Sequence, residues 1–261
     1  MLEVLALPAF SDNYIWLAHD GQHAVVIDPG DAAPVLACLE AQRLQLSAIL
    51  LTHHHPDHIG GVRTVLARHP AQVIGHHADA HRLPPLTTPV EDGAVLQVPG
   101  LDWQVDVIAT PGHTTGHICY YGAGLLFCGD TLFRGGCGRM FEGTPEQYSH
   151  SLKRLAALPA DTAVYPAHEY TVDNLLFAAS LTPDDTLVQA ALRLARQTRL
   201  AGQPTLPSSI GWEQRHNPYL RCEEPDMLAA LQLPPATTAA TAFATMRQMK
   251  DQFRPAPQTA P

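Results

Sequence analysis

The stretch Ala48-Ile49-Leu50-Leu51-Thr52-His53-His54-His55-Pro56-Asp57-His58 decides most of what the sequence predicts. Its first four residues are apolar and predict a buried strand, and the next seven include four histidines and an aspartate. Imidazole and carboxylate groups suit Zn, Fe or Mn, and no cysteine lies in the stretch to favour a thiolate site. Because side chains alternate along an extended segment, His53 and His55 lie on the same side and His54 faces elsewhere. We therefore expect a metal site at the end of this strand, with His54 packing beside it.

The composition excludes several classes of protein. The 261 residues are 46% hydrophobic and 16% charged, which is typical of a soluble globular protein that is long enough to bury a sizeable core. The formal net charge of −9 disfavours nucleic acid and anionic membranes as partners, so we expect neither. The apolar N-terminus lacks the basic leader and the cleavage site of a signal peptide, and no apolar run is long enough to span a membrane.

The cysteines indicate a reducing compartment. The five are scattered, odd in number and never paired as Cys-x-x-Cys, a pattern that favours free thiols over a disulfide framework. Cys119 and Cys128 fall in strand-like apolar runs, and we expect both in the core. We expect a cytoplasmic monomer.

The first two-thirds of the chain predicts a layered α/β sandwich over residues 1–170. Short β-type runs alternate with Gly, Pro and Asp turns. The expected strands are Tyr14–Ala18, Ala24–Ile27, Ala48–Leu51, Gln72–Ile74, Gln104–Ala109, His117–Tyr121, Leu125–Cys128 and Ala163–Tyr165. Helical patterns lie between some of them, at Ala33–Gln42, Gly61–Arg68 and Pro145–Ala157.

Residues 171–261 have a different pattern, in which helices dominate. The expected helices are Asp173–Leu181, Thr186–Leu200, Pro225–Ala230 and Thr241–Phe253, and Gly202–Tyr219 is expected to be an irregular connection. Because short helices are marginal in isolation, we expect a small α-helical domain that packs on the first. A mobile tail is expected after about residue 254, where Pro is frequent.

Three further ligand-type residues follow apolar runs, as His53 does. They are His113 after Val105–Ala109, Asp130 after Leu126–Cys128 and His168 after Val164–Tyr165. A strand that gives way to a small residue and then to His or Asp is how α/β folds place chemistry at one sheet edge. The candidate ligands are His53, His55, Asp57, His58, His113, Asp130 and His168. Seven are too many for one tetrahedral ion, so we expect two ions that share a bridging carboxylate.

Other histidines and aspartates are less informative. His117 is either an outer partner of the same site or an ordinary strand residue. Asp28, Asp31 and most remaining histidines lack a comparable context, and for them a solvated surface position is the default expectation.

The ligand pattern resembles the metallo-β-lactamase superfamily, whose members fold as a four-layer αβ/βα sandwich with a dinuclear site on one edge. More closely, several segments are similar to the glyoxalase II (hydroxyacylglutathione hydrolase) family within it. They are Ser11-Asp12-Asn13-Tyr14, Gly129-Asp130-Thr131-Leu132-Phe133, Gly135-Gly136-Cys137-Gly138-Arg139, His168-Glu169-Tyr170-Thr171, Asn217-Pro218-Tyr219-Leu220-Arg221 and Lys250-Asp251-Gln252-Phe253. These segments span nearly the whole chain, including its helical part.

The resemblance implies roles for individual residues. It places His53, His55 and His113 on one ion, Asp57, His58 and His168 on the other, and Asp130 between them. It also implies that Arg139, Tyr170, Arg247 and Lys250 hold a glutathione moiety. Arg247 and Lys250, three residues apart, share one face of a helical pattern that would otherwise be read as solvated.

Two positions depart from the family pattern. Phe141 replaces a family tyrosine, which removes one hydroxyl contact to the ligand. Arg139 stands where lysine is common, so the charge is kept but the geometry is not.

The implied reaction is hydrolysis of an S-(2-hydroxyacyl)glutathione thioester, typically S-D-lactoylglutathione, to glutathione and D-lactate, the second step of methylglyoxal detoxification. A hydroxide held by two divalent ions would attack the carbonyl, since a bound metal lowers the pKa of water from about 15.7 toward 7. We expect Zn, with Fe or Mn as alternatives, and Asp57 and Asp130 as the catalytic carboxylates. The alternatives are a persulfide dioxygenase of the same superfamily, which uses one iron, and a non-catalytic metal-binding module.

Overall fold

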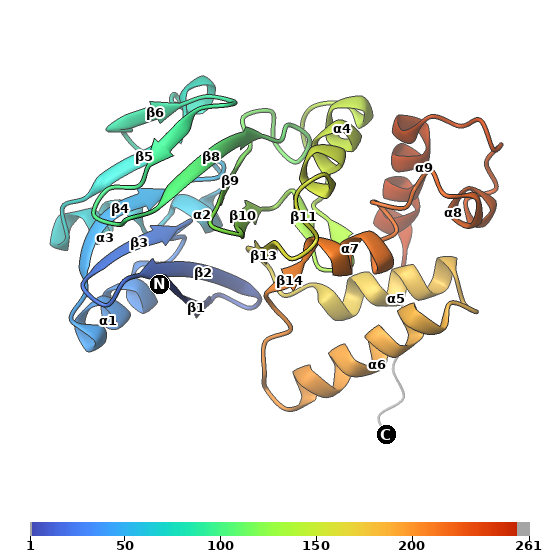
Figure 1. Cartoon of the computed structure of the whole chain (residues 1–261), viewed down its shortest axis with the longest axis horizontal. Helices are drawn as coiled ribbons and strands as arrows, with labels where there is room; N and C mark the ends of the chain where they lie inside the picture. Colours follow the sequence, from blue (N-terminus) through green and yellow to red (C-terminus); the bar gives the residue numbers. More distant parts are fainter. Residues whose placement is uncertain (1, 255–261) are drawn as a thin grey trace.

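Two six-stranded sheets form the centre of the structure, a computed structural model that describes residues 2–254 (Figure 1). The first sheet contains, in spatial order, β1 (Glu3–Ala9), β2 (Asn13–His19), β3 (His23–Ile27), β4 (Gln45–Leu50), β5 (Gln72–His76) and β6 (Thr88–Val90). The second contains β14 (Ser208–Ser209), β13 (Ala163–Pro166), β10 (Leu125–Gly129), β9 (Ile118–Gly122), β8 (Gln104–Ala109) and β7 (Val95–Gln97). A short hairpin, β11 (Leu132–Phe133) and β12 (Gly136–Cys137), follows β10.

The main core lies between the two sheets. Apolar side chains from facing strands form one buried cluster, including Trp16 and Leu50 from the first sheet and Val107, Tyr120 and Phe127 from the second. Burial of these faces is the main favourable term that holds the sheets together.

Helices cover the outer faces of both sheets. The helices α1 (Ala32–Gln42) and α3 (Val62–Arg68) pack on the first sheet, and α4 (Pro145–Ala156) packs on the second. The Asp31 side chain accepts a hydrogen bond from the Ala33 amide and so starts α1, and Thr144 and Gln147 form a capping box at the start of α4. The expected αβ/βα sandwich is confirmed.

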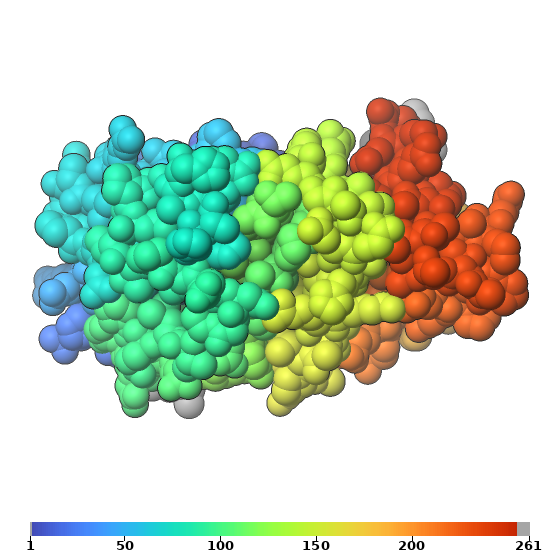
Figure 2. Space-filling view, turned by 90° about the horizontal axis from the view of Figure 1, so that it is seen from above, coloured from blue at the N-terminus to red at the C-terminus, as the bar shows by residue number. Residues whose placement is uncertain are grey.

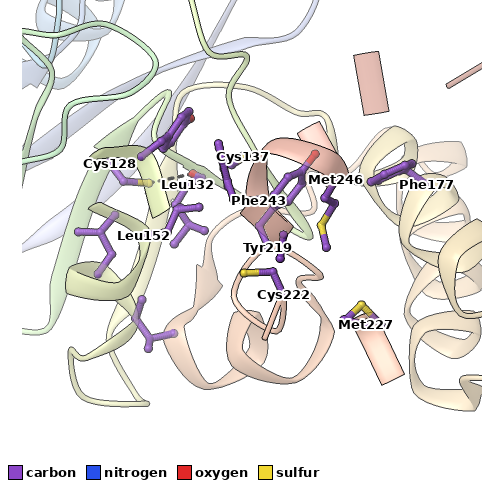
Figure 3. Close-up of a cluster of buried hydrophobic side chains, with 14 of the residues drawn as sticks. Cys128, Leu132, Cys137, Leu152, Phe177, Tyr219, Cys222, Met227, Phe243 and Met246 are labelled. Carbon is purple, nitrogen blue, oxygen red and sulfur yellow. Dashed lines mark hydrogen bonds between the residues drawn. The ribbon is translucent and has the colours of Figure 1, made fainter. Parts of the chain in front are cut away.

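The helices that follow β13 in the chain gather at one end of the molecule (Figures 1 and 2). They are α5 (Thr171–Leu181), α6 (Thr186–Leu200), α7 (Ile210–His216), α8 (Pro225–Ala230) and α9 (Ala239–Gln252). Figure 3 shows Phe177 of α5 and Phe243 and Met246 of α9 in the same buried cluster as Cys128 of β10 and Leu152 of α4. The helices are therefore stabilised by packing on the second sheet and its helix.

All the strands and helices expected from the sequence are present, with ends shifted by a few residues. The expectation that Gly202–Tyr219 is irregular was wrong, because this segment contains β14 and α7. Ser208 and Ser209 pair with Val164 and Ala163, so the C-terminal part supplies an edge strand to the second sheet. A two-residue strand carries no periodic pattern, and its position depends on the neighbouring β13.

Three other expectations concern the C-terminal tail, membrane-spanning helices and two cysteines. The tail expected after about residue 254 lies outside the described residues. Within residues 2–254, no helix is both long and apolar enough to cross a membrane. Cys119 and Cys128 are fully buried, as expected.

Candidate metal centre

The seven expected ligand residues lie in loops and one short helix that follow strands. His53 and His55 follow β4, Asp57 and His58 lie in the short helix α2 (Pro56–Ile59), and His113, Asp130 and His168 follow β8, β10 and β13. Because β9 is antiparallel to both β8 and β10, and β13 is parallel to β10, these three strands run in the same direction. Their carboxyl ends therefore meet at one edge of the second sheet, which is why residues far apart in sequence converge.

Six of these residues make up two of the three groups of ligand atoms in the described part of the chain, and the third group joins Asp28 with His53 and His58. His53, His55 and His113 each offer an atom within 4.8 Å of the others, and Asp57, His58 and His168 do the same. We call these the three-histidine group and the Asp57 group. The grouping is the one that the resemblance implied.

Asp130 lies between the two groups. Its Oδ2 is 3.3 Å from His113 Nε2 in the three-histidine group. Its Oδ1 is 3.3 Å from His168 Nε2 and 3.4 Å from His58 Nε2 in the Asp57 group. One carboxylate therefore faces both groups, one oxygen toward each.

The residues fit a pair of divalent ions. Among the described residues, His53 Nε2, His58 Nε2 and Asp130 Oδ1 are buried and have no hydrogen-bond partner, although buried polar atoms are nearly always satisfied. All three atoms belong to the two groups or to the carboxylate between them. Imidazole nitrogens with carboxylate oxygens suit Zn, Fe or Mn alike.

Carboxylates orient the histidines of the Asp57 group. His58 Nδ1 lies 3.0 Å from Asp28 Oδ2, and His168 Nδ1 lies 2.8 Å from Asp12 Oδ1. Asn13 Nδ2 donates to Asp57 Oδ2 at 3.0 Å. Such outer partners fix which ring nitrogen faces the ion.

The expectation that Asp28 lies at a solvated surface was wrong. Asp28 is only 4% exposed, and its carboxylate accepts hydrogen bonds from both the amide (2.8 Å) and the hydroxyl (2.6 Å) of Thr52. Since its oxygens already serve Thr52 and His58, Asp28 is an outer partner rather than a ligand. The signal was its place at the end of β3, which is parallel to β4 and therefore ends beside His53.

His117 and His54 both lie outside the two groups. The buried His117 ring stacks on His53 with centroids 4.9 Å apart, and its Nε2 accepts a hydrogen bond from the Asp130 amide at 3.1 Å. His117 is thus an outer partner, the first of its two expected alternatives. His54 Nδ1 turns away to Asp79 Oδ2 at 3.0 Å, as the alternation of side chains predicted.

The electrostatic environment differs between the groups. Burial, followed by repulsion from His113, lowers the pKa of His55 to about 4, and burial lowers the pKa of His53 well below its ordinary value. Burial also opposes the charged form of His168, but Asp130 and Asp12 outweigh it and raise the pKa to about 9. Burial disfavours ionisation of Asp130, but the charges of His168 and His58 hold its pKa well below the ordinary value. The carboxylate between the groups is therefore ionised.

A cavity of about 460 Å³ opens beside the centre. It is lined by His113, Asp130, Phe133, Cys137, Arg139, Phe141, Tyr170, Asp173, Asn174, Arg247 and Lys250. All four residues that the sequence predicted to bind glutathione are in this lining. A larger cleft of about 750 Å³ beside α1 contains none of the seven candidate ligands.

The cations in the cavity are held in different ways. Arg247 is only 8% exposed, and its guanidinium donates to the Cys137 carbonyl at 3.1 Å and to Asp251 at 3.0 Å. Lys250 Nζ donates to the Asp173 carbonyl at 2.8 Å. Arg139 is more open, with its side chain 61% exposed. A solvated helix face is thereby ruled out for Arg247.

Two aromatic rings flank the metal centre. The Tyr170 ring stacks on His168, with centroids 4.8 Å apart and planes 4° apart. The Phe141 ring is 59% exposed at the mouth of the cavity, and its centroid lies 5.5 Å from that of His55. Phe141 therefore offers an apolar surface where a tyrosine would offer a hydroxyl.

Comparisons with known proteins agree with this geometry. The profile described as "Metallo-beta-lactamase superfamily" matches residues 9–168, and the profile described as "Hydroxyacylglutathione hydrolase C-terminus" matches residues 169–253. The chain is 48% identical to a hydroxyacylglutathione hydrolase of Methylobacillus flagellatus, over 97% of this chain and 100% of that protein.

Two solved structures have a similar fold. The crystal structure of ETHE1 from Myxococcus xanthus is similar, with a TM-score of 0.64 and 27% identity over 96% of this chain and 99% of that one. A protein described as TTHA1623 in a di-iron-bound form has a TM-score of 0.61 and 27% identity, over 84% of this chain and 100% of that one.

Proposed function

This chain belongs to the hydroxyacylglutathione hydrolase family of the metallo-beta-lactamase superfamily, and we propose that it hydrolyses the thioester of S-(2-hydroxyacyl)glutathione. The products are glutathione and a 2-hydroxy acid, with S-D-lactoylglutathione as the typical substrate. The observation that carries the proposal is the position of Asp130, which faces two groups of ligand atoms beside a cavity with three cations.

We assign the residues that hold the ions from these contacts. One ion would be held by His53, His55 and His113 and the other by Asp57, His58 and His168, with Asp130 available to both. Ions bound there supply a nucleophile at neutral pH, because they lower the pKa of water, and they stabilise negative charge on the carbonyl oxygen. We propose zinc for both positions, and the di-iron form of the similar protein TTHA1623 makes iron the main alternative.

The two catalytic carboxylates have distinct tasks. Asp57 Oδ2 accepts a hydrogen bond from Asn13 Nδ2 at 3.0 Å, which fixes the carboxylate in place to accept a proton from the attacking water. Asp130 is ionised and buried, so it balances the positive charge of the centre. The leaving thiolate is a weak base and needs no dedicated proton donor.

The cavity provides recognition of glutathione. Glutathione carries two carboxylates, and Arg139, Arg247 and Lys250 supply positive charge on an otherwise acidic protein. Tyr170, whose ring stacks on His168, also lines the cavity. We propose that residues 1–170 form the catalytic domain, that residues 171–261 form a helical substrate-binding domain, and that the protein is a cytoplasmic monomer.

Metal analysis coupled to an assay of S-D-lactoylglutathione hydrolysis tests the proposal. The wild-type protein should bind two ions per chain and lose activity on chelation, and added zinc should restore it. A variant His113→Ala should lose most activity, while His150→Ala, at an exposed position of α4, should not. Thioester hydrolysis that is absent with metal restored, or oxygen consumption with glutathione persulfide at one iron per chain, would reject the proposal.

A further inference from the structure

Five side chains that the proposed mechanism does not use form a connected line beside the three-histidine group. Asp79 accepts from Arg82 Nε at 2.6 Å through Oδ1 and contacts His54 Nδ1 at 3.0 Å through Oδ2. Arg82 Nη1 donates to Glu142 Oε1 at 2.6 Å. Glu142 Oε2 in turn accepts from the amide of Thr115 at 2.7 Å and from its hydroxyl at 2.9 Å. We call these five residues the Arg82 network.

The Arg82 network joins the loops that carry the three-histidine group. His54 lies between His53 and His55, and Thr115 lies two residues after His113. At the Glu142 end, the Glu142 amide donates to the His113 carbonyl at 3.3 Å. A single guanidinium at the centre therefore connects both loops.

The packing around Asp79 leaves little freedom. Asp79 is 1% exposed, and a Cβ added at Gly116 would lie 2.4 Å from its Cγ, so the loop after His113 lies directly against the carboxylate. Arg82 is 28% exposed and binds two carboxylates at once. A bridging guanidinium fixes geometry more tightly than a single surface ion pair does.

The two groups of ligands are supported differently. In the Asp57 group, the carboxylates of Asp28 and Asp12 contact His58 and His168 directly. Apart from Asp130 on His113 and the contact of His113 with His55 at 3.0 Å, the direct hydrogen-bond partners of the three-histidine group within residues 2–254 are uncharged, namely the Thr52 hydroxyl on His53 and the Arg139 carbonyl on His113. The Arg82 network adds charged contacts between the two loops that carry this group.

We propose that Arg82 is a positioning residue, which holds the His53–His55 loop and the His113 loop at the separation that the three-histidine group needs to bind its ion. This inference rests on the proposed pair of ions. Loss of the guanidinium removes the charged link between the two loops and weakens the binding of the ion in the three-histidine group, whereas the Asp57 group keeps its carboxylate-bound histidines.

The test is zinc binding by Arg82→Met, which keeps the aliphatic stem and removes the charge. Competition with a chromogenic chelator gives the two dissociation constants of each protein. One of them should rise about tenfold or more, the size usual for the loss of an outer partner, and the other should stay within about twofold. Arg82→Lys keeps the charge but cannot bind both carboxylates in the same geometry. Its affected dissociation constant should lie between those of wild type and Arg82→Met.

Arg221→Met is the matched control, because Arg221 also binds several carboxylates, those of Asp185, Glu224 and Asp226, but in the helical part. It should leave both constants unchanged. If Arg82→Met does not fold, Glu142→Gln can replace it, because it breaks the same network and should weaken the binding of the same ion. If a folded Arg82→Met or Glu142→Gln variant has both zinc dissociation constants equal to those of wild type, the inference is overturned. If the wild-type protein binds no zinc, the proposed function is overturned instead.

Discussion

Asp28 and His58 form a buried pair behind the metal centre, with Oδ2 and Nδ1 separated by 3.0 Å. The side chains of His58 and Asp28 are only 1% and 4% exposed. Since the carboxylate accepts the Nδ1 proton, Nε2 is the nitrogen that would bind an ion in the group that contains Asp57 and His168. The pair therefore sets both the orientation and the tautomer of one ligand.

Asp28→Asn should weaken metal binding about 10- to 100-fold and lower thioester hydrolysis at limiting metal, because a neutral amide holds the imidazole less firmly. Metal titration monitored by activity measures this effect. Asp31→Asn is the control, because Asp31 caps α1 and asparagine caps equally well. Equal metal affinities for Asp28→Asn and wild type would show that the pair does not orient the ligand.

Substrate binding should weaken at high pH because Lys250 loses its charge. Burial, followed by the charge of Arg247, lowers its pKa to about 8. The ammonium is present below that value and is lost as the pH rises through it, so KM for the anionic substrate should rise about tenfold between pH 7 and pH 10, with a smaller change in kcat.

The Lys250→Arg variant separates this effect from titration of the substrate. Arginine stays protonated over the whole range, so the rise in KM should disappear. A rise that persists unchanged in Lys250→Arg would assign it to another group.

Phe141→Tyr should improve the binding of glutathione thioesters. The Phe141 ring is exposed at the mouth of the cavity, so a hydroxyl added there can reach the ligand without disturbing the core. One neutral hydrogen bond corresponds to a fall in KM of roughly 2- to 10-fold. Phe10→Tyr, on an equally exposed ring outside the cavity, should leave KM unchanged. A KM that does not fall in Phe141→Tyr would mean that the ring does not face the substrate.

Glu213 should make stability depend on pH. Burial raises its pKa to about 7, although hydrogen bonds from Ser208, Gly135 and Asn217 act in the opposite direction. Between pH 4.5 and pH 7 the folded protein retains a proton that the unfolded chain has lost, so this contribution to stability falls as the pH rises.

The comparison of wild type with Glu213→Gln isolates this effect. Between pH 4.5 and pH 7, the free energy of unfolding of the variant should increase relative to that of wild type by up to about 3 kcal/mol. Urea unfolding at several pH values measures the difference. A difference that does not change with pH would indicate that Glu213 is ionised throughout.

Local patterns predicted the strands and helices, and the residues that they suggested as ligands lie close together. His53, His113, Asp130 and His168 each follow an apolar run, and a strand end is where such a fold exposes side chains. The convergence of His113, Asp130 and His168 also followed, since their strands run in the same direction and present their carboxyl ends at one edge of the second sheet.

The features that the sequence did not predict are those that depend on pairing between distant segments. Asp28 lies beside His58 only because β3 and β4 are parallel neighbours, and no local pattern distinguishes it from a turn aspartate. The Arg82 network joins loops about 60 residues apart, so its members look like unrelated surface charges in the sequence. The strand β14 exists through its pairing with β13.

The most direct measurement is the metal content and thioesterase activity of Asp130→Ala beside wild type, both reconstituted with zinc. Wild type should contain two ions per chain, and Asp130→Ala should contain one or fewer and hydrolyse S-D-lactoylglutathione at least 100-fold more slowly, since both groups lose the carboxylate that faces them. Asp102→Ala, at an exposed position, should match wild type. Two tightly bound ions and full activity in Asp130→Ala, or full activity of wild type without metal, would contradict the shared carboxylate.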